Sequence, residues 1–338
     1  MSDSQRWQTA YKTAVRDPRE LCRILELPEA YHEPAVRAAQ SFPLFVTRSF
    51  LSRIRPGDPF DPLLRQVLPL AAETDSIPGF IADPVDDAAA RTHPGLLQKY
   101  AGRALLITTG ACAIHCRYCF RRHYPYQDAP SSIAEWQPAI DAIAADSTLD
   151  EVLLSGGDPL SLVDQRLQEL LEHLAAIPHL QRVRWHTRLP IVIPERVTPG
   201  LLALLRGTRL MNLVVVHTNH PQEIDDAVAT ALAQLVDHGI PVLNQTVLLR
   251  QINDSAKTLA ALSRRLLQCK VLPYYLHQLD RVSGAAHFEV SPARGLAIVD
   301  ELRSQLPGYA VPRYVQEIAG ATSKLPVLGE HFHAGALP

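Results

Sequence analysis

Residues 104–120, ALLITTGACAIHCRYCF, contain the features that decide the fold: a short apolar run followed at once by three closely spaced cysteines. The run ALLITT has the apolar, partly β-branched composition of a buried strand. Five similar runs follow, each separated from the next by a stretch with the period of an amphipathic helix. They are EVLLS (151–155), RVRWH (182–186), NLVVV (212–216), VLNQTVLL (242–249) and VLPYYLH (271–277).

Helical periodicity fills the intervals between these runs and continues after the last of them. The predicted helices cover 133–145, 162–177, 199–206, 221–238, 256–269 and 291–306. A further strand-like piece near 309–318 closes the pattern. Because strands that alternate with helices pair in parallel through right-handed crossovers, the sequence predicts an α/β fold. We expect a partial or full parallel (β/α) barrel, with a doubly wound open sheet as the alternative.

The first ~100 residues have a different sequence pattern, in which prolines separate short amphipathic segments. We therefore expect three parts: a helix-rich N-terminal extension over residues 1–95, the barrel over 96–330, and a tail over 331–338.

Composition excludes several classes of protein. Hydrophobic residues make up 47% of the 338 positions and charged residues 20%, which excludes wholesale disorder. The net charge of −2 shows no basic excess for nucleic acid. No apolar run approaches the ~20 residues that cross a membrane, and the N-terminus lacks the apolar core of a secretory signal. We expect a cytoplasmic protein without a nucleic-acid or membrane partner.

Three of the five cysteines form a C-x3-C-x2-C pattern at Cys112, Cys116 and Cys119. Three thiolates on one short loop can hold three corners of an iron–sulfur cube and leave the fourth iron open to a small molecule. Their place after a predicted strand is the ligand-binding end of a parallel α/β fold. The alternative is a structural zinc site in which a histidine such as His115 is the fourth ligand.

This cysteine pattern after the first strand resembles the signature of the radical S-adenosylmethionine (SAM) enzymes, and the aromatic Tyr118 before the last cysteine also matches. The resemblance implies a [4Fe–4S] cluster whose open iron is chelated by SAM. One electron from the cluster would cleave SAM to a 5′-deoxyadenosyl radical.

Within that superfamily, residues ~90–330 resemble the lysine 2,3-aminomutase family. The similar blocks are LLITTGACAIHCRYCFRRHYP (105–125), LLSGGDPL (153–160), HTRLPIVIPERVT (186–198), VVVHTNHPQEI (214–224), LNQTVLLRQIND (243–254), PYYLHQLDRVSGAAHF (273–288) and SKLPV (323–327). The resemblance assigns contacts with SAM to Tyr118, Gly156, Gly157, Asp158, His217 and Gln245.

The family's second cofactor is pyridoxal 5′-phosphate (PLP), and the resemblance makes Lys324 the lysine that forms its Schiff base. The glycine run that precedes this lysine in the family is Gly-Ala-Thr-Ser here. Lys99, Tyr100 and Arg103 would bind the PLP phosphate. Lys99 replaces an arginine of the family, which keeps the charge but loses the bidentate fork.

The resemblance also places the substrate, L-lysine. Arg121 would grip its carboxylate, a task that suits the guanidinium fork. Asp280 and Glu317 would hold the ε-ammonium, with Glu317 in the place of a family aspartate.

The implied activity is that of an isomerase, a radical SAM, PLP-dependent aminomutase that converts L-α-lysine to β-lysine. The chain ends at residue 338 without cysteines after Cys269, whereas free-lysine aminomutases carry an extension with further metal-binding cysteines. Together with Glu317, this favours the short bacterial branch that supplies (R)-β-lysine for elongation factor P. The implied partners are a reductant protein, elongation factor P and its β-lysine ligase.

Three other functions stay open at this point. They are a lysine 2,3-aminomutase that serves metabolism or osmolyte synthesis, a 2,3-aminomutase for glutamate or arginine, and a zinc-bound binding module. The sequence does not indicate an oligomeric state.

Overall fold

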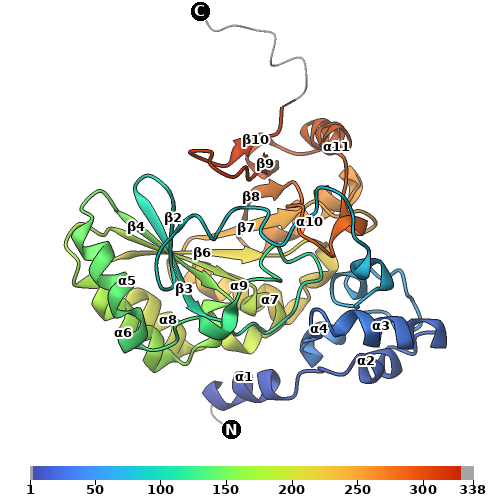
Figure 1. The fold of residues 1–338 in the computed structure, drawn as a ribbon, viewed down its shortest axis with the longest axis horizontal. Helices are drawn as coiled ribbons and strands as arrows, with labels where there is room; N and C mark the ends of the chain where they lie inside the picture. The colour runs from blue at the N-terminus through green and yellow to red at the C-terminus, as the bar shows by residue number, and fades with distance from the viewer. Residues whose placement is uncertain (1–2, 329–338) are drawn as a thin grey trace, which may run out of the picture.

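A ten-stranded sheet forms the centre of the computed structural model, which describes residues 3–328 (Figure 1). The predicted tail over 331–338 lies outside the described residues. The strands lie in the sheet in the same order as in the chain. The parallel strands are β3 (Arg103–Thr109), β4 (Glu151–Gly156), β5 (Arg182–Thr187), β6 (Met211–His217), β7 (Val242–Val247), β8 (Leu272–His277) and β9 (Arg313–Gln316).

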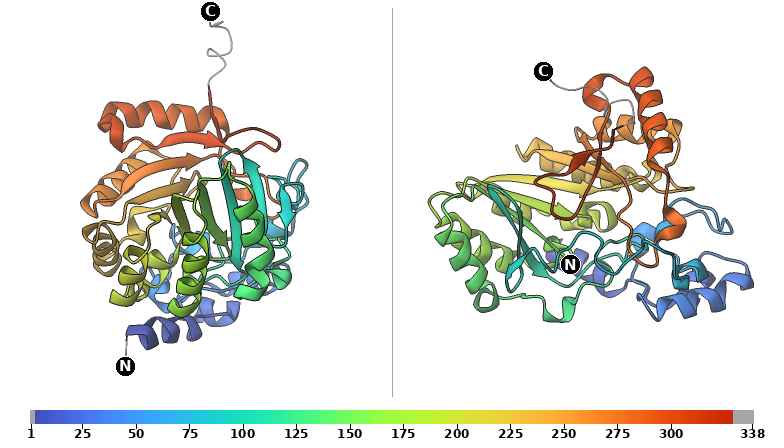
Figure 2. Two further views of the ribbon diagram at one scale, coloured as in Figure 1. Left: turned by 90° about the vertical axis from the view of Figure 1, so that its left-hand side faces the viewer. Right: turned by 45° about the horizontal axis from the view of Figure 1, so that its top comes forward.

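Helices connect these strands along the outer side of the curved sheet (Figure 2). The longer ones are α5 (Ile133–Ala145), α6 (Asp164–Ala175), α8 (Pro199–Arg206), α9 (Asp226–Asp237), α10 (Ala256–Gln268) and α11 (Pro292–Gln305). The strand order never reverses, so the doubly wound alternative is wrong. Because the two terminal strands do not pair within the described residues, the sheet is a partial barrel, as predicted.

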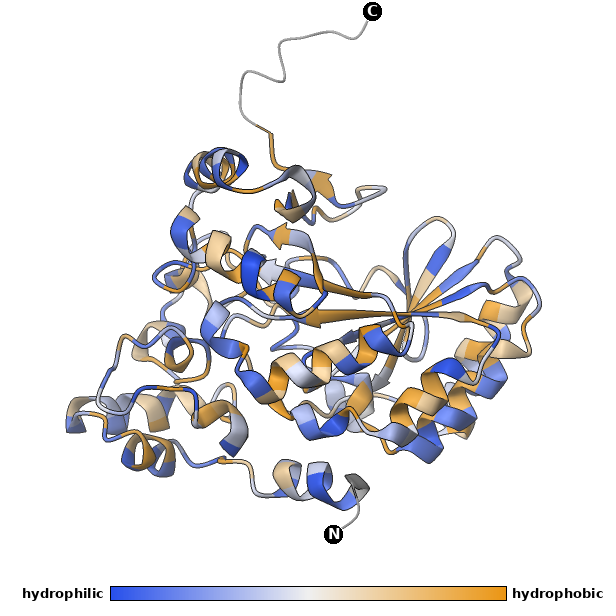
Figure 3. Ribbon diagram, turned by 180° about the vertical axis from the view of Figure 1, so that it is seen from behind, coloured by the Kyte–Doolittle hydropathy of each residue, from blue (hydrophilic) through white to orange (hydrophobic). Residues whose placement is uncertain are grey.

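The helices begin at side chains that the sequence makes available for capping. Thr198, Asp225, Ser255 and Ser291 each accept a hydrogen bond from a backbone N–H in the first turn of α8, α9, α10 and α11, respectively. In the sheet, β4 and β5 alternate between buried and half-buried residues. Figure 3 shows helices with one hydrophilic and one hydrophobic side around a largely hydrophobic sheet. No helix among residues 3–328 is long and apolar enough to cross a membrane.

Short antiparallel strands that the sequence analysis did not anticipate extend both ends of the sheet. The strands β1 (Arg91–His93) and β2 (Leu96–Tyr100) precede β3, and β10 (Leu325–Pro326) pairs with β9. The turn between β2 and β3 uses Gly102 at φ +77°, where a residue with a side chain is disfavoured.

The helix-rich extension packs beneath the cysteine loop. Its helices are α1 (Asp3–Lys12), α2 (Pro18–Ile24), α3 (His32–Ala39) and α4 (Arg48–Leu51). The apolar side chains of Trp7, Val46 and Phe50 join the same buried core as the barrel strands. The backbone of the extension also accepts hydrogen bonds from the loop, at Phe45 from His115 N (2.8 Å) and at Gln66 from Arg117 N (2.9 Å).

Candidate active site

One cavity of about 170 Å³ on the inner side of the sheet gathers most of the predicted site residues. It lies between the two ends of the partial barrel. The predicted residues that line it are Lys99, Tyr100, Arg103, Arg121, His217, Gln245, Asp280, Glu317 and Lys324. A wider hollow of about 730 Å³ beside α8 and α9 contains none of them.

The hairpin formed by β9 and β10 brings Lys324 to Glu317. Leu325 pairs with Gln316, so the next residues inward, Lys324 and Glu317, face each other at the mouth of the hairpin loop. The Lys324 Nζ donates a hydrogen bond to Glu317 Oε2, and the Nζ of Lys99 lies 3.1 Å from Glu317 Oε1. Burial would raise the pKa of Glu317, but Lys324 and Lys99 together hold it below its usual value.

An unpredicted carboxylate, Asp87, joins two predicted cations. Its Oδ2 accepts a hydrogen bond from Arg121 Nε at 2.6 Å, and its Oδ1 lies 2.8 Å from Lys99 Nζ. Burial opposes ionisation of Asp87, yet Arg121 and Lys99 keep its pKa low. Arg121 also donates to Ser155 Oγ at 3.3 Å. Sequence reasoning missed Asp87, because a single aspartate in an irregular segment carries no pattern.

Asp280 is a further carboxylate of the cavity, half-buried by exposed area. Its burial and the nearby charge of Glu317 raise its pKa to about 7, and Lys324 and Lys99 only partly offset this. At neutral pH, Glu317 is therefore ionised and Asp280 is partly protonated, and both carboxyl groups face the same cavity. An incoming ammonium group would favour the ionised form of both.

Tyr100 and Arg103 flank the Gly102 turn, and the Arg103 guanidinium lies 4.7 Å from the centre of the Tyr100 ring. Burial and the nearby charge of Glu317 raise the pKa of the Tyr100 hydroxyl. Among residues 3–328, Arg103 has no carboxylate partner, so its charge is available to an anion such as a phosphate. Lys99 is already paired with two carboxylates, and its predicted phosphate contact stays a prediction.

His217 and Gln245 occupy neighbouring positions at the ends of β6 and β7, with His217 Nε2 and Gln245 Nε2 3.0 Å apart. Burial, assisted by the charge of Arg188, lowers the pKa of His217 to about 3. Two further histidines, His186 and His277, line the same cavity, and the buried Nε2 atom of each lacks a partner in the described structure. Sequence reasoning missed both, since their strands read as core.

The three predicted cluster ligands, Cys112, Cys116 and Cys119, carry free thiols on the loop after β3. Among residues 3–328, no three histidine, cysteine or acidic side chains surround a single point as ligands of one metal ion. Three thiols on one loop are the number of protein ligands that a cube with one open iron requires. The assignment of these three cysteines as cluster ligands stays a prediction.

His115, the predicted fourth ligand of a zinc site, is held by the N-terminal extension. Its ring stacks on Phe42 with centres 5.1 Å apart, and its Nδ1 lies 2.8 Å from the carbonyl oxygen of Pro43. Through these contacts, His115 holds the N-terminal extension against the cysteine loop.

The glycine loop after β4 packs against the start of the cysteine loop. A Cβ atom at Gly157 would lie 2.3 Å from Ala111 O, and one at Gly156 would lie 2.7 Å from Thr109 O. The Asp158 carboxylate accepts hydrogen bonds from Thr187 Oγ1 (2.7 Å) and Arg188 N (2.6 Å). The predicted SAM contacts of Gly156, Gly157 and Asp158 stay predictions, and what the structure adds is a packing role.

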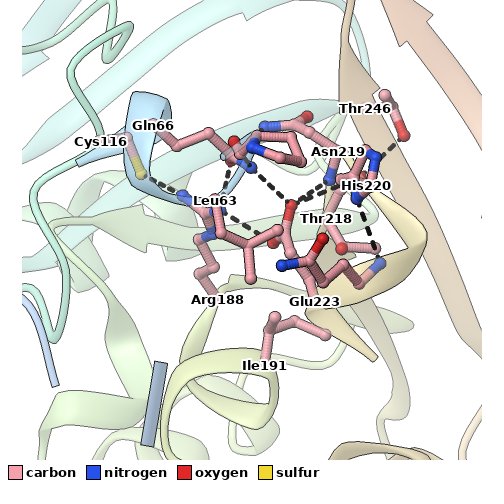
Figure 4. A network of polar contacts seen from close by, with 12 residues as sticks. Leu63, Gln66, Cys116, Arg188, Ile191, Thr218, Asn219, His220, Glu223 and Thr246 are labelled. Carbon is pink, nitrogen blue, oxygen red and sulfur yellow. Dashed lines mark hydrogen bonds and ion pairs between the residues drawn. The ribbon is translucent and has the colours of Figure 1, made fainter. Parts of the chain in front are cut away.

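Tyr118 points into a buried polar network outside the cavity. Its hydroxyl accepts hydrogen bonds from Arg188 Nη1 (2.9 Å) and Asn219 Nδ2 (2.6 Å). Gln66 and Glu223 complete this network, which Figure 4 shows around Arg188. The predicted SAM contact of Tyr118 remains untested.

The chain is similar over nearly its whole length to several L-lysine 2,3-aminomutases. It is 47% identical to that of Escherichia coli over 322 residues, which cover 95% of this chain and 94% of the relative. Identity to the Haemophilus influenzae protein is 45% over 322 residues, with 95% of both chains covered. The protein of Clostridium subterminale is 34% identical over 328 residues, which cover 97% of this chain and 79% of the relative. No family model matches the chain.

Similarity to solved structures is weaker. Streptococcus suis SuiB bound to precursor peptide SuiA has a TM-score of 0.49 and 14% identity, over 66% of this chain and 50% of that chain. A radical SAM methyltransferase from Sphaerobacter thermophilus has a TM-score of 0.44 and 19% identity, over 65% and 68%.

Proposed function

The chain belongs to the L-lysine 2,3-aminomutase family, and from this premise we propose that it moves the 2-amino group of L-lysine to carbon 3, giving β-lysine. One observation carries the proposal. A single cavity holds a guanidinium, Arg121, two carboxylates, Asp280 and Glu317, and a reactive amine, Lys324. These are the groups that a diamino acid and an aldehyde cofactor require.

Enzymes of this family are radical SAM enzymes that use a [4Fe–4S] cluster, SAM and PLP. Cys112, Cys116 and Cys119 would hold the cluster, and Lys324 would hold PLP. When bound, the reduced cluster supplies the electron that cleaves SAM to a hydrogen-abstracting radical, and PLP supplies the aldehyde and ring that stabilise a neighbouring radical.

Arg121 is oriented for the substrate carboxylate. Asp87 fixes its Nε at 2.6 Å, and Ser155 accepts weakly from Nη1, so the rest of the guanidinium faces the cavity. A carboxylate that approaches this edge gains charge-assisted hydrogen bonds in a nearly dry environment. Arg121 would thus set the position of the α-carbon.

Asp280 and Glu317 would bind the ε-ammonium group at the other end of the substrate. Glu317 contacts both Lys99 and Lys324, and the withdrawal of either cation frees a carboxylate oxygen. Asp280, whose pKa is about 7, would lose its proton when the ammonium arrives. Two carboxylates against one cation favour lysine over an acidic substrate such as glutamate.

Apolar side chains line much of the cavity: Leu97, Leu105, Leu153 and Val247. They limit the water that can reach the reacting carbons. Exclusion of water protects a radical from side reactions.

We further propose that the product is (R)-β-lysine, made for attachment to elongation factor P by its β-lysine ligase. The higher identity to the E. coli and H. influenzae relatives than to the Clostridium protein supports assignment to the short branch. A reductant protein would deliver the electron. The free thiols on the cysteine loop suit a reducing cytoplasm.

Anaerobic incubation with SAM, dithionite, PLP and L-lysine tests the activity, with chiral chromatography and mass spectrometry of the product. We expect (R)-β-lysine and no product from glutamate or arginine. Turnover of either of these amino acids in place of lysine would contradict the assignment. Addition of elongation factor P and its ligase tests the pathway, because a mass increase of the factor should then require this enzyme.

A further inference from the structure

A buried arginine outside the cavity contacts one of the predicted cluster ligands. Arg188, at the start of the segment after β5, places its Nη1 2.7 Å from Cys116 Sγ (Figure 4). Only 5% of the residue is exposed to solvent. A guanidinium in direct contact with a ligand sulfur bears on the electronic state of whatever metal that sulfur binds.

The surrounding residues fix the orientation of this guanidinium. Its Nη2 donates to Gln66 Oε1 at 2.7 Å and to Glu223 Oε2 at 2.9 Å. Its Nη1 also donates to Tyr118 Oη at 2.9 Å, and the Asp158 carboxylate accepts from its backbone N–H. Arg188 is therefore held in place before any cofactor binds.

Glu223 is the counter-charge of Arg188 and is itself fully buried. Its Oε1 accepts hydrogen bonds from Gln66 Nε2 (3.0 Å) and from the backbone N–H groups of Asn219 (2.9 Å) and His220 (3.0 Å). With all these partners, Glu223 stays fixed on the side of Arg188 away from Cys116. Cys116 Sγ therefore contacts the cation of a buried ion pair, and the anion, Glu223, lies on the other side of that cation.

We propose that Arg188 is a positioning residue that raises the reduction potential of the iron–sulfur cluster through Cys116, and that Glu223 moderates this effect. The proposal rests on the cluster of the proposed function. Reduction adds one electron, delivered by the reductant, and hence one negative charge to the cluster. A nearby cation stabilises that charge, and hydrogen bonds to the sulfurs are a recognised determinant of cluster potential.

The low dielectric of the surroundings makes the effect large enough to measure. Charges interact far more strongly in a protein interior than in water. The cation and the counter-ion act with opposite signs, so the loss of each should move the potential in opposite directions. A merely structural role predicts no such opposition.

The test is an EPR-monitored redox titration of the whole protein, reconstituted anaerobically with iron and sulfide. In Arg188→Gln, we expect the reduced-to-oxidised ratio at a fixed applied potential to fall about tenfold, which is about 59 mV for one electron. Arg188→Lys should give an intermediate shift, since it keeps the charge but not the fork.

Glu223→Gln should shift the potential the other way, to less negative values. In this variant Arg188 Nη2 keeps Gln66 Oε1 as an acceptor. Arg196→Gln is the matched control, because Arg196 is also fully buried and paired, with Asp164, but does not contact a cysteine. We expect the control to titrate like the wild type.

The titration reads only the loaded fraction of each sample, so partial loss of the cluster does not mimic a shift. If Arg188→Gln takes up no iron, Arg188→Lys and Glu223→Gln decide the question. Unchanged potentials, or shifts of both charge variants in the same direction, would overturn the proposal and leave the aminomutase assignment intact. A wild-type protein that binds no cluster would overturn both.

Discussion

Lys99 and Glu317 come from opposite ends of the ten-stranded sheet and form an ion pair across the open side of the partial barrel, with Nζ 3.1 Å from Oε1. Lys99 lies on β2, and Glu317 follows β9 directly. The same Glu317 binds Lys324, and the same Lys99 binds Asp87. These partly buried pairs join the predicted phosphate, substrate and Schiff-base residues in one charge network, so a change in one pair should alter the others.

Lys324→Ala should abolish β-lysine formation. Lys99, the other described lysine of the cavity, is held by two carboxylates, Asp87 and Glu317, and should not replace Lys324. The same variant should fail to retain PLP covalently. Borohydride treatment of the wild type, followed by peptide mass spectrometry, should place the cofactor on Lys324. Lys257→Ala, at an exposed position on α10, is the control and should behave as wild type. Covalent PLP on another lysine would show that the assignment is wrong.

Asp280→Asn should weaken the use of lysine without preventing folding, since it removes a charge but keeps the shape. Loss of one partner of a buried charge pair costs about 2 kcal/mol or more, which corresponds to about 30-fold or more in kcat/KM. Steady-state kinetics over a range of lysine concentrations measures this. Asp300→Asn, on the exposed side of α11, should have no effect. An unchanged kcat/KM in Asp280→Asn would exclude Asp280 from the ammonium site.

The pH dependence of kcat/KM should follow the protonation of Asp280. Because burial and Glu317 raise the pKa of Asp280 to about 7, its carboxyl group is partly neutral in the free enzyme at neutral pH. The charged form binds an ammonium group, so kcat/KM for lysine should rise with pH through about 7 and level off above it. A kcat/KM profile checks this, and the limb should be absent in Asp280→Asn. A limb that persists in the variant must belong to another group.

The sequence predicted the barrel and the cysteine loop because both depend on local patterns. The apolar runs and helical periods near β3–β9 match their observed bounds within a few residues. The short β10 is different, since its two residues carry no pattern and depend on pairing with β9. The proximity of Glu317 and Lys324 follows from that pairing.

The missed site residues share a physical reason. Asp87 acquires its role only when Arg121 and Lys99 fold against it. His186 and His277 look like ordinary strand residues until the curvature of the sheet turns them toward one cavity. Such contacts depend on tertiary structure, which the period of a single segment does not encode.

Gly157→Ala should disturb the cysteine loop. The new Cβ would lie 2.3 Å from the carbonyl oxygen of Ala111, a backbone atom that cannot move without shifting the loop after β3. We expect a loss of about 1–3 kcal/mol in the free energy of unfolding, together with reduced uptake of iron. Urea unfolding and iron analysis measure these. Gly308→Ala is the control, since nothing lies within 4 Å of its Cβ. Equal stability of the two variants would contradict the packing argument.

Glu73→Gln tests how the extension is coupled to the cluster loop. Glu73 accepts hydrogen bonds from Arg117 Nε (2.9 Å) and Arg122 Nη2 (2.7 Å), two nearly or fully buried cations that flank Cys119 in sequence. Neutralising the shared carboxylate leaves both cations buried without a counter-ion.

Removal of one partner from such a pair costs about 3–5 kcal/mol, so we expect a loss of this size in the free energy of unfolding. Faster proteolysis within residues 40–75 should accompany it, because the charge that docks this segment on the loop is gone. Glu33→Gln is the matched control, since Glu33 pairs with Arg19 on the exposed surface and should leave the unfolding curve unchanged. If both variants unfold alike, the buried triad does not hold the extension, and the apolar contacts of Phe50 and its neighbours must do so alone.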